Sequence, residues 1–272
     1  MAAVNTGELV YKQTLLTRLT HWVWAISLFF LLLTGLQIFN AHPVLQFGQQ
    51  SGFAYDNALL EIGAASGPNG KPAGFVDVAG YRFDTTGWLG AFGSSLSPTL
   101  QAFPPALTIP SNHDLATGRV IHFFFAWVLS GTLLIWLIAS LWSGHLQRDL
   151  LPRAADLKAL PKSIAEHARL KFHHEKSYNV LQKLAYAGVL FVLFPLIIAT
   201  GLTMSPSMNA RFPFMLDLFG GRQTARSLHF LAMLGLAGFF LIHMLMILAA
   251  GPLNEMRSII TGWYRTDGKG DH

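Results

Sequence analysis

Four stretches of this sequence are apolar, and each lacks Asp, Glu, Lys and Arg over a length that can cross a lipid bilayer. They run at about Leu19–Ala41, Val120–Trp142, Leu184–Thr203 and Ser227–Ala250. Crossing takes roughly 20 apolar residues, and the backbone in hydrocarbon must satisfy its own hydrogen bonds, which favours helices. The pattern predicts an all-α fold, a single domain over residues 1–272, built as an integral membrane four-helix bundle. Its helices are expected at about residues 19–41, 118–142, 181–203 and 227–250.

The connections between these stretches differ in character. The first, a long outer loop at about residues 42–116, is rich in Gly, Pro, Ser and aromatic residues. It lacks the periodicity that predicts regular elements, and its aromatic residues favour a packed cap or a docking surface. The second connection predicts an amphipathic helix near Pro161–Phe172 that lies on the membrane surface. The first apolar stretch is longer than the core of a cleaved signal, so we expect it to remain as a helix.

Charge is scarce, and its distribution predicts the orientation in the membrane. Charged residues make up 12% of the chain, where a soluble domain carries about a quarter. Thirteen of the 19 Lys and Arg residues fall in the N-terminal tail, the middle connection and the C-terminal tail. The positive-inside rule therefore places both termini in the cytoplasm, with the chain in a bacterial inner membrane. The net charge of +5 is then a signal of topology, and no nucleic-acid partner is expected.

Four histidines lie inside or at the edge of the apolar stretches: His21, His122, His229 and His243. An ionisable group in a membrane span is costly, so it is a functional candidate. The alternative for any single one is an interfacial or core histidine bonded to a carbonyl group. The chain has no cysteine, which excludes disulfides, iron–sulfur clusters and covalently attached haem.

The spacing of these histidines predicts two pairs at different depths. His229 and His243 share a helix face and lie about 21 Å apart along the axis. Because the first helix runs outward and the second runs back, His21 lies at the inner level with His243, and His122 at the outer level with His229. Two stacked pairs fit two haems with two axial histidines each, whereas zinc would need further ligands at each level.

Other residues near these positions fit bound haem. Arg18, Arg119 and Arg226 each precede a histidine by three residues and share its face. They are candidates to pair with haem propionates, although an arginine that extends toward the lipid headgroups accounts for each one equally well. Small residues let a flat macrocycle or a neighbouring helix approach; they are Gly35, Gly118, Gly131, Gly188 and Gly201.

Segments around these histidines and at the start of the third helix resemble a known family. The segments Arg18–Trp22, Gly118–Phe123, Tyr178–Lys183 and Arg226–Phe230, with His243 after the last, are similar to the four-helix dihaem cytochrome b subunits of bacterial respiratory complexes. These include the membrane subunits of formate dehydrogenase and NiFe hydrogenase, the thiosulfate-reductase type and cytochrome b561-like proteins. The resemblance covers all four spans but not the first outer loop.

The resemblance implies two b haems and an exchangeable quinone beside one of them, usually the cytoplasmic one. Asn179 and Gln182 match polar positions at the start of the third helix, where they are candidates to bind a quinone carbonyl. The alternative is that Ser177 or Asn179 caps this helix and Gln182 faces the headgroups. The outer loop departs from the family, and it suits docking of a periplasmic oxidoreductase. By analogy alone, that partner is a molybdenum enzyme with a molybdopterin cofactor.

The leading hypothesis is therefore an electron-transfer subunit between quinone and a periplasmic partner, with no substrate chemistry of its own. One alternative is a partner-free cytochrome of the b561 kind that oxidises quinol or reduces superoxide. Another is a transporter whose histidines bind ions, although the spans lack acidic residues and an inverted repeat. Outside the spans, His42 is the best substitute for His122 as an outer ligand.

Overall fold

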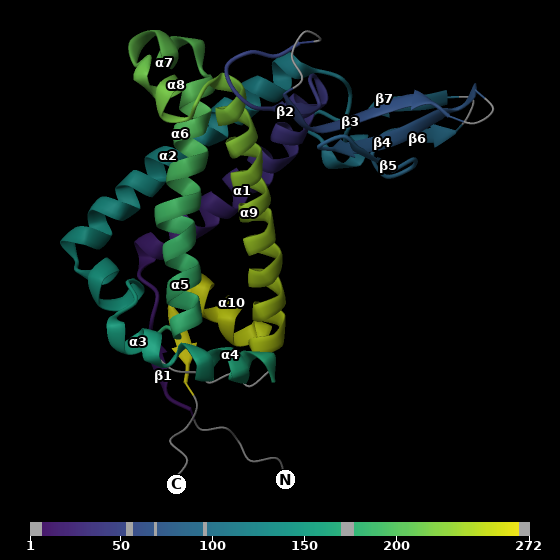
Figure 1. Cartoon of the computed structure of the whole chain (residues 1–272). Helices are drawn as coiled ribbons and strands as arrows, with labels where there is room; N and C mark the ends of the chain where they lie inside the picture. The colour runs from purple at the N-terminus through teal and green to yellow at the C-terminus, as the bar shows by residue number, and fades with distance from the viewer. Residues whose placement is uncertain (1–6, 53–56, 68–69, 95–96, 170–176, 267–272) are drawn as a thin grey trace, which may run out of the picture. The chain divides into compact units, whose positions relative to one another are not determined.

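The computed structural model of this chain describes residues 7–52, 57–67, 70–94, 97–169 and 177–266 (Figure 1). Within them, four helical spans are long and apolar enough to cross a membrane. They are α1 (Leu15–Asn40), α2 (Leu115–Trp142), a composite helix (Val180–Met204) and α9 (Arg222–Ala250). The prediction of four helices long and apolar enough to cross a membrane is confirmed.

The third span is not a regular α-helix throughout. It joins α5 (Val180–Gly188) to α6 (Phe194–Met204) through a π-helical segment at Val189–Leu193. Pro195 follows this segment closely; it has no N–H to donate, and its ring crowds the carbonyl one turn earlier. A wider π turn before the proline is a common way to absorb such a break.

The chain divides into two compact units, and each long span contributes to both of them. Unit 1 holds residues 1–24, 130–195 and 234–272, and unit 2 holds residues 25–129 and 196–233. His21 and His243 therefore belong to unit 1, whereas His122 and His229 belong to unit 2.

Unit 2 contains most of the strands. The segment after α1 folds into an antiparallel sheet in the order β2–β3–β4–β5, formed by Val44–Gln46, Ala58–Ser66, Pro72–Val78 and Tyr81–Asp84. A hairpin of β6 (Gly90–Ser94) and β7 (Ser97–Gln101) follows. After it come the 3-10 helix Pro105–Leu107 and, beyond α6, the short helices α7 (Pro206–Arg211) and α8 (Phe214–Leu218).

The hairpin approaches the sheet closely, and the sheet packs on the ends of two spans. A Cβ at Gly74 would overlap the carbonyl oxygen of Leu89, so only glycine fits there. Phe39 of α1, Leu45, Ile62 and Ala102 form the buried core below the strands, and Phe230 of α9 packs against it. These strands correct the all-α expectation, which holds for the spans but not for the outer loop.

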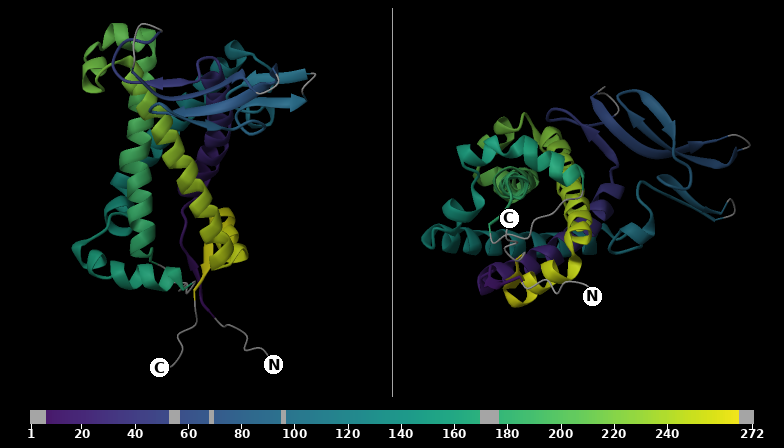
Figure 2. Two further views of the ribbon diagram at one scale, coloured as in Figure 1. Left: turned by 45° about the vertical axis from the view of Figure 1, so that its right-hand side comes forward. Right: turned by 90° about the horizontal axis from the view of Figure 1, so that it is seen from below.

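Unit 1 gathers short elements around the two ends of the described chain (Figure 2). Strand β1 (Leu9–Tyr11) pairs antiparallel with β8 (Trp263–Arg265), and Leu9 lies opposite Arg265. A π-helical turn, Leu146–Leu150, follows α2. The remaining helices are α3 (Ala154–Lys158), α4 (Leu160–Ala168) and α10 (Pro252–Thr261).

Helix α4 covers the first part of the amphipathic helix predicted near Pro161–Phe172, whose last residues, 170–172, lie outside the described residues. Helix α3 is tied to the third span by an ion pair between Lys183 and Asp156, with 2.9 Å between Nζ and Oδ2. Trp136, Leu146 and Leu150 form the buried apolar cluster of this unit.

Candidate functional site: two histidine pairs

The pair predicted at the inner level, here the inner pair, consists of His21 on α1 and His243 on α9, both in unit 1. Their ring centroids lie 6.5 Å apart, and the ring planes are inclined by 55°. Phe239 stacks on His243 at 5.5 Å, and Trp22 meets His21 edge-on at 5.6 Å. Nδ1 of His21 is buried and has no hydrogen-bond partner among the described residues.

The pair predicted at the outer level, here the outer pair, consists of His122 on α2 and His229 on α9, both in unit 2. Their ring centroids lie 6.4 Å apart, at an interplanar angle of 54°. Each ring nitrogen Nδ1 contacts a threonine of a neighbouring helix. Thr34 Oγ1 lies 3.0 Å from His122, and Thr200 Oγ1 lies 3.1 Å from His229.

The threonine hydroxyls set the direction of these hydrogen bonds. Thr34 donates to the carbonyl of Phe30, and Thr200 donates to that of Leu196, both at 2.6 Å. A hydroxyl has one proton, so each threonine oxygen accepts from Nδ1–H of its histidine. That tautomer leaves Nε2 of each outer histidine as the lone-pair nitrogen, which is the form a metal requires.

A glycine follows each of these threonines and makes room for the ring. A Cβ at Gly35 would lie 3.5 Å from Cε1 of His122, and a Cβ at Gly201 only 3.2 Å from Cε1 of His229. These two glycines, predicted to admit a macrocycle or a helix, thus admit the histidine rings. Gly118 lies against Gln37, while Gly131 and Gly188 have no described heavy atom within 4 Å of such a Cβ.

The spacing of both pairs fits a metal ion bound between the rings. With each nitrogen about 2 Å from the ion and about 1.1 Å from its ring centroid, the centroids would lie about 6 Å apart. The observed separations are 6.5 and 6.4 Å. The described residues hold no group of three or more His, Cys, Asp or Glu that could bind a metal. Zinc would need such a group, so the pairs fit better as the two axial ligands of a metal ion whose other ligands come from a macrocycle.

The three arginines predicted near the haems have protein contacts. Arg18 donates to the carbonyl of Thr261 at 2.9 Å, while its Nε is buried without a partner among the described residues. Arg226 donates to the carbonyl of His42. Arg119 lies over the ring of Phe123, with Cζ 5.7 Å from the centroid.

Asn179 and Gln182 form a capping box at the start of α5. Asn179 Oδ1 accepts from the N–H of Leu181 at 2.9 Å and from the hydroxyl of Ser163 at 2.6 Å. Gln182 Oε1 accepts from the N–H of Asn179 at 3.1 Å. The side-chain oxygens of Asn179 and Gln182 therefore cap the helix, which was the alternative to quinone binding. A quinone carbonyl would need a donor, and the capping contacts use only acceptors.

His42, the predicted substitute ligand, lies just beyond α1. Burial lowers the pKa of its ring, and the positive charge of Arg226 lowers it further, while a hydrogen bond to Gln46 acts in the opposite direction. The structure pairs His229 with His122 and not with His42.

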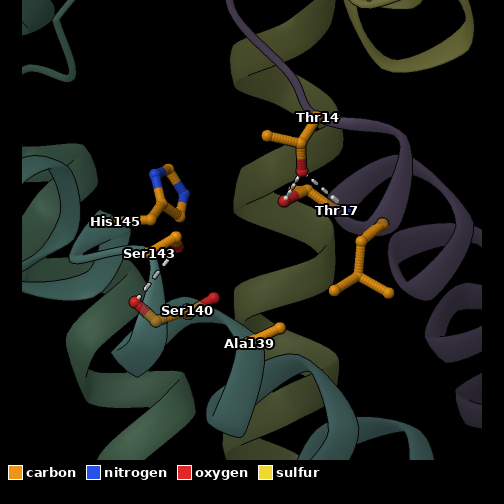
Figure 3. Close-up of a pocket in the computed structure, with 7 residues that line it drawn as sticks. Thr14, Thr17, Ala139, Ser140, Ser143 and His145 are labelled. Carbon is orange, nitrogen blue, oxygen red and sulfur yellow. Dashed lines mark hydrogen bonds between the residues drawn. The ribbon is translucent and has the colours of Figure 1, made fainter.

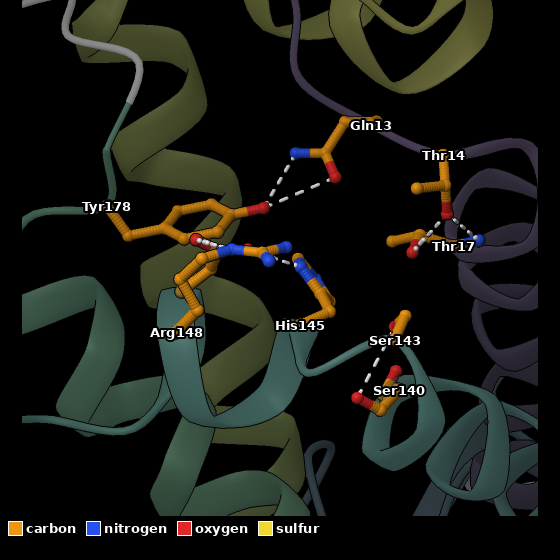
Figure 4. Close-up of polar contacts among 9 residues, drawn as sticks. Gln13, Thr14, Thr17, Ser140, Ser143, His145, Arg148 and Tyr178 are labelled. Atoms are coloured by element: carbon orange, nitrogen blue, oxygen red, sulfur yellow. Dashed lines mark hydrogen bonds and ion pairs between the residues drawn. The ribbon is translucent and has the colours of Figure 1, made fainter.

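A small cavity that the sequence did not predict lies in unit 1, between the start of α1 and the end of α2 (Figure 3). It has a volume of about 170 Å³ and is lined by Thr14, Leu16, Thr17, Ala139, Ser140, Ser143 and His145. Near His145, Gln13 and Tyr178 exchange hydrogen bonds through the tyrosine hydroxyl (Figure 4). Burial raises the pKa of that hydroxyl.

Sequence reasoning missed two groups of residues. Thr34 and Thr200 are each followed by glycine inside a span, and this repeated Thr–Gly pair is a signal that could have been read. The cavity residues come from two separate helix ends and a turn, so no local motif marks them.

Four apolar helices that bring internal histidines together in facing pairs define a class of integral membrane proteins with candidate metal-ligand pairs. Comparison with known families narrows this class. The profile of the prokaryotic cytochrome b561 family matches residues 86–262, which is more than half of the chain.

The chain belongs to this family, and it is therefore a membrane haem protein of the cytochrome b561 type; the resemblance seen in the sequence is confirmed. The chain is also 25% identical over 232 residues to a protein of Azospira oryzae with the provisional name protein-methionine-sulfoxide reductase subunit YedZ1. The alignment covers 85% of this chain and 86% of that protein.

Proposed function

We propose that this chain is the membrane electron-transfer subunit of a reductase complex, carrying electrons from quinol through two b haems to a periplasmic partner. The observation that carries the proposal is the presence of two facing histidine pairs, at 6.5 and 6.4 Å, in a chain of the cytochrome b561 family. His21 and His243 would hold the inner haem, and His122 and His229 the outer one. The bound haems supply one-electron transfer.

The chain's own residues would orient and shield these groups. Thr34 and Thr200 hold the outer histidines in the tautomer that exposes Nε2. Arg18 and Arg226, with Arg119, are the candidates to bind propionates; the unpartnered Nε of Arg18 supports this role for that residue.

The name of the relative from Azospira oryzae supports a direction of electron flow and a kind of partner. A methionine sulfoxide takes up two electrons and two protons to give a thioether and water, so such a partner consumes electrons, and a quinol in the membrane is the reductant. We propose a periplasmic protein-methionine-sulfoxide reductase as the partner. By analogy, it holds a molybdopterin cofactor.

The outer segment offers a surface for this partner. The side chains of Tyr81, Phe83 and Trp88 are exposed by 74, 57 and 81%, and exposed aromatic residues favour protein contacts. For the outer segment to face the periplasm, both termini must lie on the cytoplasmic side of the inner membrane, as the positive-inside rule predicts. At the inner level, Asn179 and Gln182 remain candidates for a quinone carbonyl through their amide N–H groups.

A dithionite-reduced minus oxidised spectrum, with haem counted per chain, tests the proposal. We expect two low-spin b haems, and His→Ala changes at His21 or His243 should remove one while changes at His122 or His229 remove the other. A well-folded preparation supplied with haem that binds none, or only one, would refute it. Co-purification with a soluble reductase separates this function from that of a partner-free quinol oxidase.

A further inference from the structure

We propose that the cavity beside His145 binds the head group of the quinol and that His145 accepts its proton. This inference rests on the proposed function and assigns its quinol site. The cavity has a volume of about 170 Å³, and its lining combines hydroxyl groups with the apolar side chains of Leu16 and Ala139 (Figure 3). Such a lining suits a flat ring with oxygens at its edges.

A carboxylate orients the ring of His145. Its Nδ1 lies 2.8 Å from Oδ2 of Asp149, and Arg148 binds the same oxygen at 3.3 Å. Burial raises the pKa of the Asp149 carboxyl, but the hydrogen bonds from His145 and Arg148 outweigh it, so this pKa lies below its ordinary value. An ionised Asp149 accepts Nδ1–H, which leaves Nε2 of His145 free to take a proton.

The hydroxyl groups suit both redox forms of the ligand. Thr14 and Thr17 lie with their Oγ1 atoms 3.0 Å apart on one side of the cavity, and Ser140 and Ser143 lie on the side of α2. A hydroxyl donates to a quinone carbonyl and accepts from a quinol hydroxyl. A side chain that only donates or only accepts would favour one form.

The cavity lies close to the inner pair along the chain. Thr17 precedes His21 by one helical turn and shares its face of α1, so the two are separated by about 6 Å along the axis. Oxidation would proceed in two one-electron steps. In each step a quinol oxygen would lose its proton to Nε2 of His145, which would release it to water before the next step, and the electron would pass to the haem that His21 and His243 would hold. Two such transfers give the quinone, two protons and the two electrons that the sulfoxide reductase consumes.

His145 has a route for the protons to water. Its side chain is 15% exposed, and that of Asp149 is 35% exposed. The capping box of Asn179 and Gln182 contains no titratable group, so it offers no acceptor for a proton. The cavity at His145 therefore supplies what quinol oxidation needs and the capping box lacks.

The test compares variants of the full-length, haem-loaded protein in lipid nanodiscs. A stopped-flow experiment would measure haem reduction by a short-chain ubiquinol or menaquinol analogue, with dithionite defining the total reducible haem. We expect His145→Gln to slow reduction by about 100-fold, the size of a lost general base, with unchanged haem content. Ser140→Val should mainly raise the KM for quinol. Asp149→Asn should slow the reaction, and Asp149→Glu should restore part of the rate.

His167→Gln is the matched control, because His167 lies on α4 in the same unit, bonds the carbonyl of Ser163 at 2.8 Å and does not line the cavity. Equal rates in His145→Gln and the control would overturn the inference and return the quinol to Asn179 and Gln182. Loss of haem from His145→Gln or Ser140→Val would also overturn it, because the cavity would then belong to the haem. If neither quinol reduces the wild type while dithionite does, the proposed function itself fails.

Discussion

If the outer pair binds a haem as proposed, replacing Thr34 or Thr200 with valine should weaken haem binding at that pair only. Valine keeps the branched shape of threonine but removes the oxygen that accepts Nδ1–H of His122 or His229. A buried donor left without a partner costs about 1–3 kcal/mol. The backbone carbonyls of Leu31 and Ile197 also interact with these two rings, which keeps the cost near the lower end.

The expected loss is about 1 kcal/mol per variant, or about five- to tenfold in affinity for the outer haem. Each threonine contacts a different histidine of the outer pair, the proposed axial ligands, so the double variant should lose roughly the product of the two factors. The assay is haem titration of the apoprotein, followed by a redox titration and low-temperature EPR of the loaded form. The outer haem should show a changed potential and signal, while the inner haem keeps both.

Thr203→Val is the matched control. Thr203 is buried, with 1% exposure, and donates to the carbonyl of Ala199 at 2.8 Å, as Thr200 does to that of Leu196. In the described residues its hydroxyl forms no hydrogen bond with His122 or His229. If Thr203→Val lowers the affinity as much as Thr200→Val, the effect is general destabilisation. If neither Thr34→Val nor Thr200→Val changes the outer haem, the threonines do not position the ligands.

Three further predictions follow from single contacts. Gly201→Ala should shift the spectrum of the outer haem more than Gly35→Ala, because the new Cβ would lie 3.2 rather than 3.5 Å from the facing ring; absorption spectra of the two variants decide this. Because the pKa of His42 is lowered in the folded protein, this histidine takes up a proton at a higher pH in the unfolded chain. Stability should therefore fall as the pH drops below about 6.5, and His42→Gln should reduce the change in unfolding temperature between pH 7.5 and 5.5. Asp156→Asn should lower the unfolding temperature at pH 7 by leaving Lys183 without its carboxylate. The pKa of Asp156 is lowered by a backbone hydrogen bond at Arg153 and by Lys183, so its contribution is present above about pH 4 and should vanish on further acidification.

The four spans were readable from the sequence because an apolar stretch that stays free of charge over 20 or so residues is rare outside membrane helices. The pairing of His21 with His243, and of His122 with His229, followed from chain direction and helical rise, and the structure brings those residues together. Their role as haem ligands stays a prediction, as do the roles of the three arginines.

The outer strands could not be predicted, because their sequences lack an alternation of large and polar side chains. Strand β3 ends in Gly63, Ala64, Ala65 and Ser66, which pair with Phe75, Gly74, Ala73 and Pro72 of β4. Small residues let the hairpin approach but carry little periodic signal. The cavity at His145 could not be predicted for a different reason, because its lining is assembled from side chains about 125 residues apart in the sequence.

The short ladder between β1 and β8 constrains how the chain is threaded through the bilayer. Backbone hydrogen bonds form only between segments in the same compartment, and Leu9 and Arg265 are opposite each other in this ladder. The chain between them must therefore cross the membrane an even number of times. An arrangement with three or five crossings would separate the two strands by the full thickness of the bilayer. Six residues of β-structure thus require an even number of membrane crossings, independently of the charge distribution.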